Sequence, residues 1–308
     1  MRKAIMVTCI IAAICLVIGA VLSFTALASI GFDFGKLNTT EMEHGEYAIA
    51  EDFSFIEIHA VSADVRLNLS EDDRCRVEYA TRNGVKTSVE NGVLYVHAMP
   101  TKLIDFIQIT NMNEYVTLYL PFETYEELFV ETTSGDVYIF PSFDSVKKAT
   151  ISSTSGDISF IGTVSDTLFA ESTSGNVVIR EPNAKTVHVE TTSGEITLNA
   201  VYATNVSVET TSGDVNLDGV TAKEKLTAST NSGEIELYCD ATELYLESTS
   251  GDIEGSIGSA KNYIVNTTSG RVRIPPRDQN AGVCEIHTTS GDIEIKTAKD
   301  PINSFGDD

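Results

Sequence analysis

Acidic side chains recur at intervals of about twenty residues in the second half of the chain, each directly after a glycine. Asn176 and Arg271 break the series, which otherwise consists of Asp136, Asp157, Glu195, Asp214, Glu234, Asp252 and Asp292. Carboxylates held in a row could bind Ca²⁺, which takes roughly six to eight oxygen ligands. They could also cap the backbone amides of a repeated turn and keep the protein soluble. Because the period and the glycine pattern differ from those of calcium-binding β-rolls, we expect capping and no metal site.

Serines directly precede the same glycines and invite comparison with nucleophiles. They are Ser134, Ser155, Ser174, Ser193, Ser212, Ser232, Ser250, Ser269 and Ser290. A nucleophilic serine needs a base within hydrogen-bond reach. The histidines share no phase with these serines along the chain; they are His44, His59, His97, His188 and His287. We therefore interpret the serines as turn residues and expect no catalytic site and no cofactor.

The glycines between the serines and the acids set the period of the whole array. They are Gly135, Gly156, Gly175, Gly194, Gly213, Gly233, Gly251, Gly270 and Gly291. A fixed period of this length is typical of a solenoid, in which each unit buries its apolar face only by stacking on its neighbours. Glycine is expected at such a corner because the backbone needs either a positive φ or a close approach there.

Apolar and polar residues alternate on both sides of each glycine. Before Gly194 the apolar residues are Val187 and Val189, and after it they are Ile196 and Leu198. A period of two indicates strands, and a crossover between parallel strands is almost always right-handed. The sequence therefore predicts an all-β fold: a right-handed parallel β-solenoid, or β-helix, of about ten coils with repeats of about 19 residues.

The N-terminal segment is apolar and precedes the repeats. Residues 4–30 contain no charged side chain. This uncharged segment is longer than the roughly 20 residues that are needed to cross a bilayer. Arg2 and Lys3 precede this segment and Asp33 follows it, so the prediction is one transmembrane helix with the C-terminal part outside the cell. The alternative is a signal peptide cleaved after Ala28, which would give a secreted protein.

Five parts are expected along the chain. They are the basic N-terminus and transmembrane helix (1–30), a tether (31–48), an N-terminal coil with an irregular β cap (49–127), the regular solenoid (128–297) and a tail (298–308). In the cap, Ser62-Ala63-Asp64 aligns with the repeated corner, and Asn83-Gly84 and Asn91-Gly92 are typical of hairpin turns. Residues 103–109 are apolar and out of phase, so they either cover the open end of the solenoid or contact a partner.

Charge limits the partners. The formal net charge is −24, and without Arg2 and Lys3 there are 19 basic against 45 acidic residues. Nucleic acid and anionic lipid surfaces are poor partners for such a field, whereas cations and cationic ligands suit it.

Cys239 and Cys284 fall on the inward phase of their strands, and with Cys75 they make an odd set without metal-site spacing. We interpret Cys239 and Cys284 as small core residues.

Three stretches together resemble a known family. They are Phe-Ile-Glu-Ile at 55–58 with Ser-Ala-Asp-Val at 62–65, Val-Thr-Leu-Tyr-Leu-Pro at 116–121, and Val-Glu-Thr-Thr-Ser-Gly-Asp-Val at 130–137 with its echoes. They are similar to the bacterial "putative adhesin" β-solenoid domain, a domain of unknown function, over about residues 52–296. The resemblance implies a non-enzymatic envelope protein that is often membrane-anchored, with some relatives linked to envelope-stress signalling. It assigns no binding residue to this chain.

The function predicted is therefore a membrane-anchored bacterial envelope protein that presents an acidic β-solenoid outside the cell for binding or scaffolding. One alternative is a sensor or regulator of envelope stress that acts through a membrane partner. A less favoured one is a glycan-active β-helix enzyme, because most turns are short and the chain has no Trp to stack on sugars.

Overall fold

A computed structural model describes residues 42–98, 113–140 and 145–298. The chain divides into a unit of residues 1–42 with 102–112 and a unit of 43–101 with 113–308, and the description below concerns the second unit. The expected transmembrane helix, the apolar segment 103–109 and most of the tail lie outside the described residues. Within the described ranges, no helix has the length and hydropathy to cross a bilayer.

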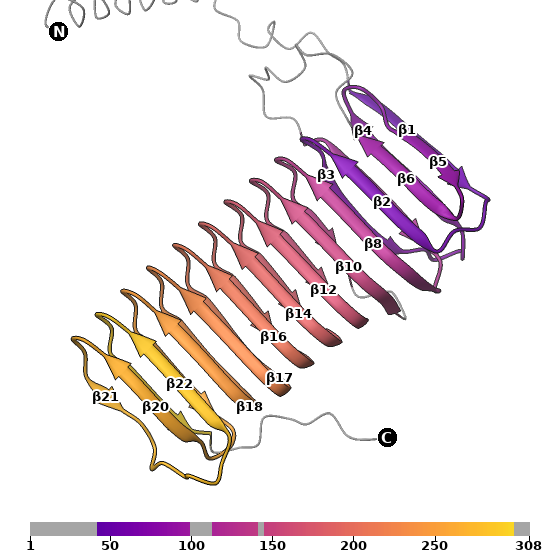
Figure 1. The fold of residues 1–308 in the computed structure, drawn as a ribbon. Coiled ribbons are helices and arrows are strands. Elements are labelled where there is room, and N and C mark those ends of the chain that lie inside the picture. The colour runs from indigo at the N-terminus through magenta and orange to yellow at the C-terminus, as the bar shows by residue number, and fades with distance from the viewer. Residues whose placement is uncertain (1–41, 99–112, 141–144, 299–308) are drawn as a thin grey trace, which may run out of the picture. The chain divides into compact units, whose positions relative to one another are not determined.

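The described part consists of strands arranged on two faces, as Figure 1 shows. The first face holds the strands that precede the corners: β2 (Phe55–Ala60), β6 (Val93–Ala98), β8 (Thr124–Thr132), β10 (Ser145–Ser153), β12 (Val164–Ser172), β14 (Asn183–Thr191), β16 (Tyr202–Thr210), β20 (Asn262–Thr267) and β22 (Val283–Thr288). The second face holds the strands that follow them: β3 (Asp64–Leu69), β7 (Tyr115–Leu120), β9 (Val137–Ile139), β11 (Ile158–Ile161), β13 (Val177–Arg180), β15 (Ile196–Asn199), β19 (Ile253–Ile257), β21 (Val272–Arg273) and β23 (Ile293–Thr297). Two long strands contribute to both faces: β17 (Val215–Thr230) and β18 (Ile235–Ser248).

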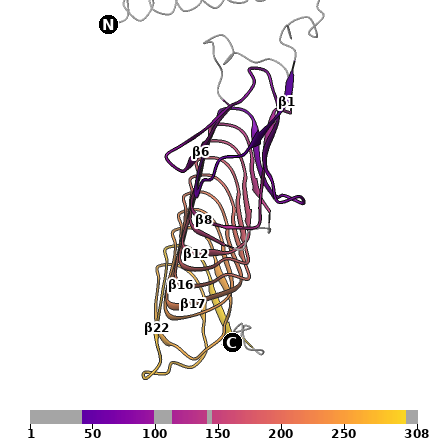
Figure 2. The ribbon, with the colours of Figure 1, turned by 90° about the vertical axis from the view of Figure 1, so that its right-hand side faces the viewer.

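Successive coils pair in parallel and in register, which confirms the predicted all-β solenoid. Val187 of β14 lies opposite Val206 of β16, and Ile196 of β15 lies opposite Val215 of β17. The solenoid has about eight turns, and the predicted number of about ten coils is not confirmed. Turned by 90°, the same coils appear as a stack of loops (Figure 2).

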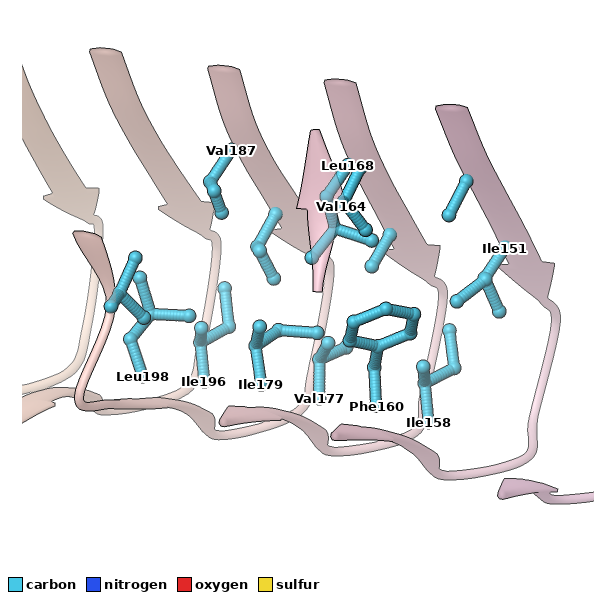
Figure 3. Packing of buried hydrophobic residues seen from close by; sticks show 14 of the residues in the cluster. Ile151, Ile158, Phe160, Val164, Leu168, Val177, Ile179, Val187, Ile196 and Leu198 are labelled. Carbon is cyan, nitrogen blue, oxygen red and sulfur yellow. The ribbon is translucent and has the colours of Figure 1, made fainter. Parts of the chain in front are cut away.

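The core is the space between the two faces, and it continues from coil to coil. Phe160 and Ile179 of the second face meet Leu168 and Val187 of the first, as Figure 3 shows, and each is at most 1% exposed. Burial of a Val, Leu, Ile or Phe side chain contributes roughly 1.5–3 kcal/mol. Because inward positions alternate along every strand, each coil adds several such side chains to one shared core.

Both ends of the array depart from the order of the sequence. At one end the coil of β2 and β3 lies between the coil of β6 and β7 and the coil of β8 and β9. At the other end β22 pairs with both β18 and β20, and β23 pairs with both β19 and β21. The coil of β22 and β23 is thus inserted between two coils that precede it in the chain. The repeat pattern alone predicts that coils stack in the order of the chain, so it does not predict this change of order at the two ends.

A buried lysine spans the inserted coil. Lys261 is 2% exposed, and its Nζ donates to Asp240 Oδ1 (3.0 Å), to Ser259 Oγ (2.6 Å) and to the Ala241 carbonyl. Asp240 and Ala241 belong to β18, whereas Lys261 immediately precedes β20. The ammonium group therefore ties the outermost coil to the coil beneath the inserted one, with three hydrogen bonds to compensate its burial.

Three antiparallel strands close the N-terminal end. Strand β1 (Glu43–Ile49) pairs with β4 (Cys75–Thr81), β4 pairs with β7, and β5 (Lys86–Glu90) pairs with β6. Residues 43–48, expected to be tether, thus belong to β1. Asn91 and Gly92 have φ of 54° and 79° and join β5 to β6 as the predicted hairpin. The hairpin prediction for Asn83-Gly84 is wrong, because β4 and β5 lie on different faces and the turn carries the chain between them.

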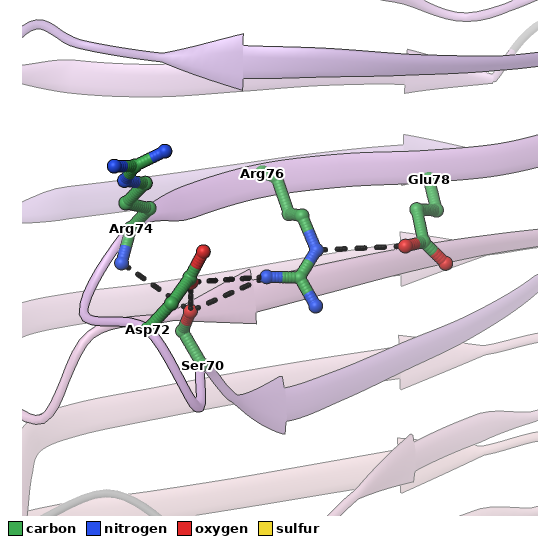
Figure 4. Close-up of polar contacts among 5 residues, drawn as sticks. All are labelled: Ser70, Asp72, Arg74, Arg76 and Glu78. Atoms are coloured by element: carbon green, nitrogen blue, oxygen red, sulfur yellow. Dashed lines mark hydrogen bonds and ion pairs between the residues drawn. The ribbon is translucent and has the colours of Figure 1, made fainter.

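A polar cluster holds the reversal from parallel β3 to antiparallel β4 (Figure 4). Asp72 Oδ1 accepts from Ser70 Oγ (2.7 Å) and from Arg76 Nη1 (3.2 Å), and Arg76 also lies 3.5 Å from Glu78. The Ser70 hydrogen bond lowers the pKa of the Asp72 carboxyl. On its other side the Arg76 guanidinium lies 4.0 Å from the centre of the Tyr119 ring, a cation–π contact.

The corner glycines are required by close approach. Their φ values are outside the positive range, which among the described glycines is occupied by Gly84, Gly92, Gly162, Gly219 and Gly255. A Cβ added to Gly213 would overlap the carbonyl oxygen of Gly194 in the neighbouring coil, and the other corners of the array show the same overlap. Of the two reasons considered for glycine at the corner, only the close approach applies.

We therefore predict that Gly213→Val destabilises the protein far more than Asn216→Val. The first change forces side-chain atoms into backbone of the next coil and should cost about 3 kcal/mol or more. The second replaces an outward, partly exposed side chain and should change stability by about 0.5 kcal/mol or less. Thermal denaturation followed by circular dichroism measures both, and equal melting temperatures would contradict the assigned packing.

Candidate functional site

The acids that follow the corner glycines bind backbone amides of the next coil. Asp136 Oδ1 accepts from Asp157 N (2.9 Å), and Asp157 Oδ1 accepts from Asn176 N (2.7 Å). Asp214 and Asp252 do the same for Glu234 N and Asp292 N. These are the hydrogen bonds that the capping interpretation predicts. In each of these aspartates, one carboxylate oxygen accepts from a backbone N–H of the neighbouring coil.

The two residues that break the acidic series also fit this geometry. Asn176 Oδ1 accepts from Glu195 N (2.9 Å), so its neutral amide oxygen caps the next coil as the aspartate carboxylates do. Arg271 belongs to the outermost coil, where the described array offers no further amide to cap. Its own N–H and its guanidinium both donate to Asp292, at 2.7 Å and 2.5 Å. Those two hydrogen bonds lower the pKa of the Asp292 carboxyl.

The glutamates of the series contribute differently because their side chains are one carbon longer. Glu195 Oε1 accepts from Thr197 Oγ1 (3.2 Å). Oxygens of the Glu234, Glu236 and Glu254 carboxylates lie within 4.8 Å of one another. Glu236 and Glu254 also line a shallow groove of about 440 Å³ on the second face. Partial burial, followed by repulsion from Glu254 and Glu236, raises the pKa of the Glu234 carboxyl.

The corner serines considered as nucleophiles are surface residues of the turn. Ser134, Ser155, Ser174 and Ser193 are all exposed, as their neighbouring threonines are. Three of the described histidines, His59, His188 and His287, lie near acids of the first face. His59 lies 2.7 Å from Glu57 and 2.9 Å from Glu131, and His287 Nε2 lies 2.7 Å from Glu285 Oε1.

A second, buried row of hydroxyls was missed. Thr210 is 3% exposed; its Oγ1 accepts from Gly213 N (3.2 Å) and donates to the Gly194 carbonyl of the neighbouring coil (3.1 Å). The same position, three residues before each glycine, holds Thr132, Ser153, Ser172, Thr191, Thr230, Ser248, Thr267 and Thr288. Every one of these is Thr or Ser on the inward phase of a strand, and a hydroxyl repeated at an apolar position was the signal available in the sequence.

A second row of acids lies on the first face and was also missed. Four residues before the glycines, the outward positions are held by Glu131, Glu171, Glu190, Glu209 and Glu247, all exposed. Glu171 lies opposite Glu190, and Glu190 lies opposite Glu209, in adjacent strands. Adjacent strands are about 4.8 Å apart, so Glu171, Glu190 and Glu209 form a continuous acidic line. Ser152 and Ser229 hold the same position in the coils that separate this line from Glu131 and Glu247. We call the five glutamates the glutamate row.

The three described cysteines are buried and free. Burial raises the pKa of the Cys75 and Cys284 thiols to about 12, and it raises the pKa of the Cys239 thiol still further. The thiols are therefore protonated at neutral pH and poor nucleophiles. They fill core positions, as expected for Cys239 and Cys284.

We predict that Thr210→Val destabilises the fold, whereas Thr211→Val leaves it unchanged. Valine matches threonine in shape but leaves Gly213 N–H and the Gly194 carbonyl without their partner, at a cost of about 2–3 kcal/mol. Thr211 is exposed, so the matched change there should stay within about 0.5 kcal/mol. Urea denaturation measures the difference, and equal midpoints would contradict a structural role for the buried row.

We further predict that Glu234→Gln stabilises the protein at pH 7 but not near pH 4. Because the folded-state pKa of Glu234 is raised, its ionised form opposes folding above that pKa, and the opposition disappears as acid protonates it. The melting temperature should rise by about 1–2 °C at pH 7 and converge with wild type at low pH. Glu224→Gln, between Lys223 and Lys225, is the control and should give no rise at either pH.

Comparison with known proteins identifies the family. The model of the Toastrack DUF4097 family matches residues 53–296. No curated protein matches the sequence. A "putative adhesin" from Parabacteroides distasonis has 14% identity and a TM-score of 0.49, covering 83% of this chain and 98% of that one. A "putative lipid binding protein" from the same species has 19% identity and a TM-score of 0.49, covering 84% and 98%.

A "putative adhesin" from Parabacteroides merdae has 14% identity and a TM-score of 0.48, and the alignment covers 84% of this chain and 97% of that one. The family match spans both faces, from the coil of β2 to β23, and so includes the repeated corners described above. The resemblance seen in the sequence is thereby confirmed: the chain belongs to the Toastrack DUF4097 family of β-solenoid domains.

Proposed function

We propose that this chain is a non-enzymatic envelope protein of a bacterium, anchored by residues 4–30, whose solenoid stands outside the cell as a rigid acidic binding surface. The observation that supports binding is the glutamate row. The corner aspartates are occupied by backbone amides, whereas the carboxylates of Glu171, Glu190 and Glu209 are exposed on a flat face.

The glutamate row is suited to binding because the strands that carry it are rigid. The strands that carry it are held by parallel pairing on both sides and by one continuous core. Carboxylates in fixed positions lose little conformational freedom when a partner binds, so an extended cationic ligand would meet a preorganised line of charge. Charge of this density also raises association rates through long-range attraction.

Binding is tested with a fluorescent lysine peptide of about ten residues titrated against the full-length chain. The variant Glu171→Gln/Glu190→Gln/Glu209→Gln should bind at least about fivefold more weakly, with a shallower salt dependence. A matched variant of the second face, Asp218→Asn/Glu236→Gln/Glu254→Gln, removes the same charge and should bind within about twofold of wild type. Equal losses in the two variants would show a diffuse field and contradict a binding row.

Anchoring is tested on the chain with a C-terminal epitope in bacterial cells. The full-length chain should remain in the membrane fraction after alkaline extraction, and protease added to intact cells should remove the epitope. Deletion of residues 4–30 should abolish both results. A mature N-terminus at residue 29 would instead establish cleavage and secretion. Crosslinking to a membrane-embedded partner would shift the function toward sensing.

A further inference from the structure

The C-terminal end of the described array is a sheet edge that is open along β20; just before β20, the Lys261 carbonyl accepts from Asp278 N (3.0 Å). Strands β20 and β21 pair on one side only, with β22 and β23, among the described residues. The other end is closed by antiparallel strands, whereas here the last strands are parallel members of the regular stack, at the lower left of Figure 1. An unpaired edge of this kind offers backbone groups to an incoming strand.

The register shows which backbone groups face outward from β20. Asn262 N donates to the Gly282 carbonyl at 2.8 Å, toward the inserted coil. In a parallel pair the direction of the backbone groups alternates, so Tyr263 and Val265 present their N–H and C=O groups to the free edge. Apolar side chains accompany them: Ile264 is 40% exposed, Val272 42% and Ile274 37%.

Charge reverses at this end. Residues 231–258 contain seven acids and no basic residue, whereas residues 259–278 contain four basic residues and one acid. Arg271 and Arg273 contact Asp292 and Glu294, yet their side chains remain 78% and 68% exposed. Arg277 Nε donates to Asn262 Oδ1 at the start of β20, and Arg271 follows the corner at the end of β20. Guanidinium groups therefore stand near both ends of the free edge.

We propose that the free edge of β20 binds an extended acidic polypeptide strand by β-augmentation. The backbone of Tyr263 and Val265 would supply main-chain hydrogen bonds, and the arginines would select acidic side chains through charge-assisted hydrogen bonds. A second copy of this chain fits the edge poorly, because two such ends would bring their arginines together. The proposal is independent of the glutamate row, which lies on the first face of the earlier coils.

The probe is a fluorescent peptide of about eight residues with alternating Glu and Val, titrated against the full-length chain by anisotropy. Val265→Pro removes an edge donor that makes no bond within the sheet, a position where edge strands tolerate proline, and should weaken binding about tenfold or more. Arg273→Gln/Arg277→Gln should weaken binding about fivefold and flatten the salt dependence. Arg180→Gln/Lys185→Gln removes the same charge elsewhere on the exposed surface and should leave binding unchanged.

Two further measurements keep the proposal falsifiable if Val265→Pro fails to fold. A peptide N-methylated at alternate residues keeps its charge but cannot pair, so it should not bind to wild type; equal binding would overturn strand addition. A Lys and Val peptide of the same pattern should not bind either, and equal binding would overturn acidic selection. A concentration-dependent dimer in light scattering that is lost in Arg273→Gln/Arg277→Gln would reassign the edge to self-association and overturn the acidic strand as occupant.

Discussion

The approach of each corner glycine to the carbonyl of the neighbouring coil is the constraint on which the rest of the structure depends. Without a Cβ, Gly213 can lie against Gly194 while strands on both faces keep the spacing of a parallel sheet. The buried hydroxyl of Thr210 then joins the N–H of one glycine to the carbonyl of the other. The same two hydrogen bonds are made by Ser172, Thr191, Thr230, Ser248 and Thr288, so backbone groups that would otherwise be unpaired at a sharp turn are satisfied in most repeats.

The same corner explains why two acidic rows of similar composition have different physical roles. Aspartate is short enough to reach an amide of the next coil, as Asp157 does with Asn176. A glutamate three residues further from the corner, on the opposite side of the glycine, lies on a strand whose side chains alternate between core and solvent. There the carboxylate points into water, as Glu190 does. Position relative to the corner, and not acidity itself, separates structural carboxylates from exposed ones.

The sequence predicted the interior of the array well because each interior coil contacts only its neighbours and obeys one period. The strands around Val187, Ile196 and Val206 follow from alternation alone. The ends were harder to predict, since pairing between β18 and β22 joins Leu244 to Cys284 across an intervening coil that has the same pattern. A repeat that fits every position equally cannot specify which copy is adjacent. The glutamate row could have been predicted from the recurring Glu-Thr-Thr-Ser-Gly, because the glutamate stands at an outward position of the strand before the glycine.

The inserted coil also has a consequence for biosynthesis. During translation β20 and β21 emerge before β22 and β23, and at that stage β18 offers them the same parallel edge that β22 finally occupies. A nascent chain that docks β20 on β18 must release it before the last coil can enter. Completion of the fold therefore waits for the final strands, and in the completed fold Lys261 reaches past the inserted coil to Asp240.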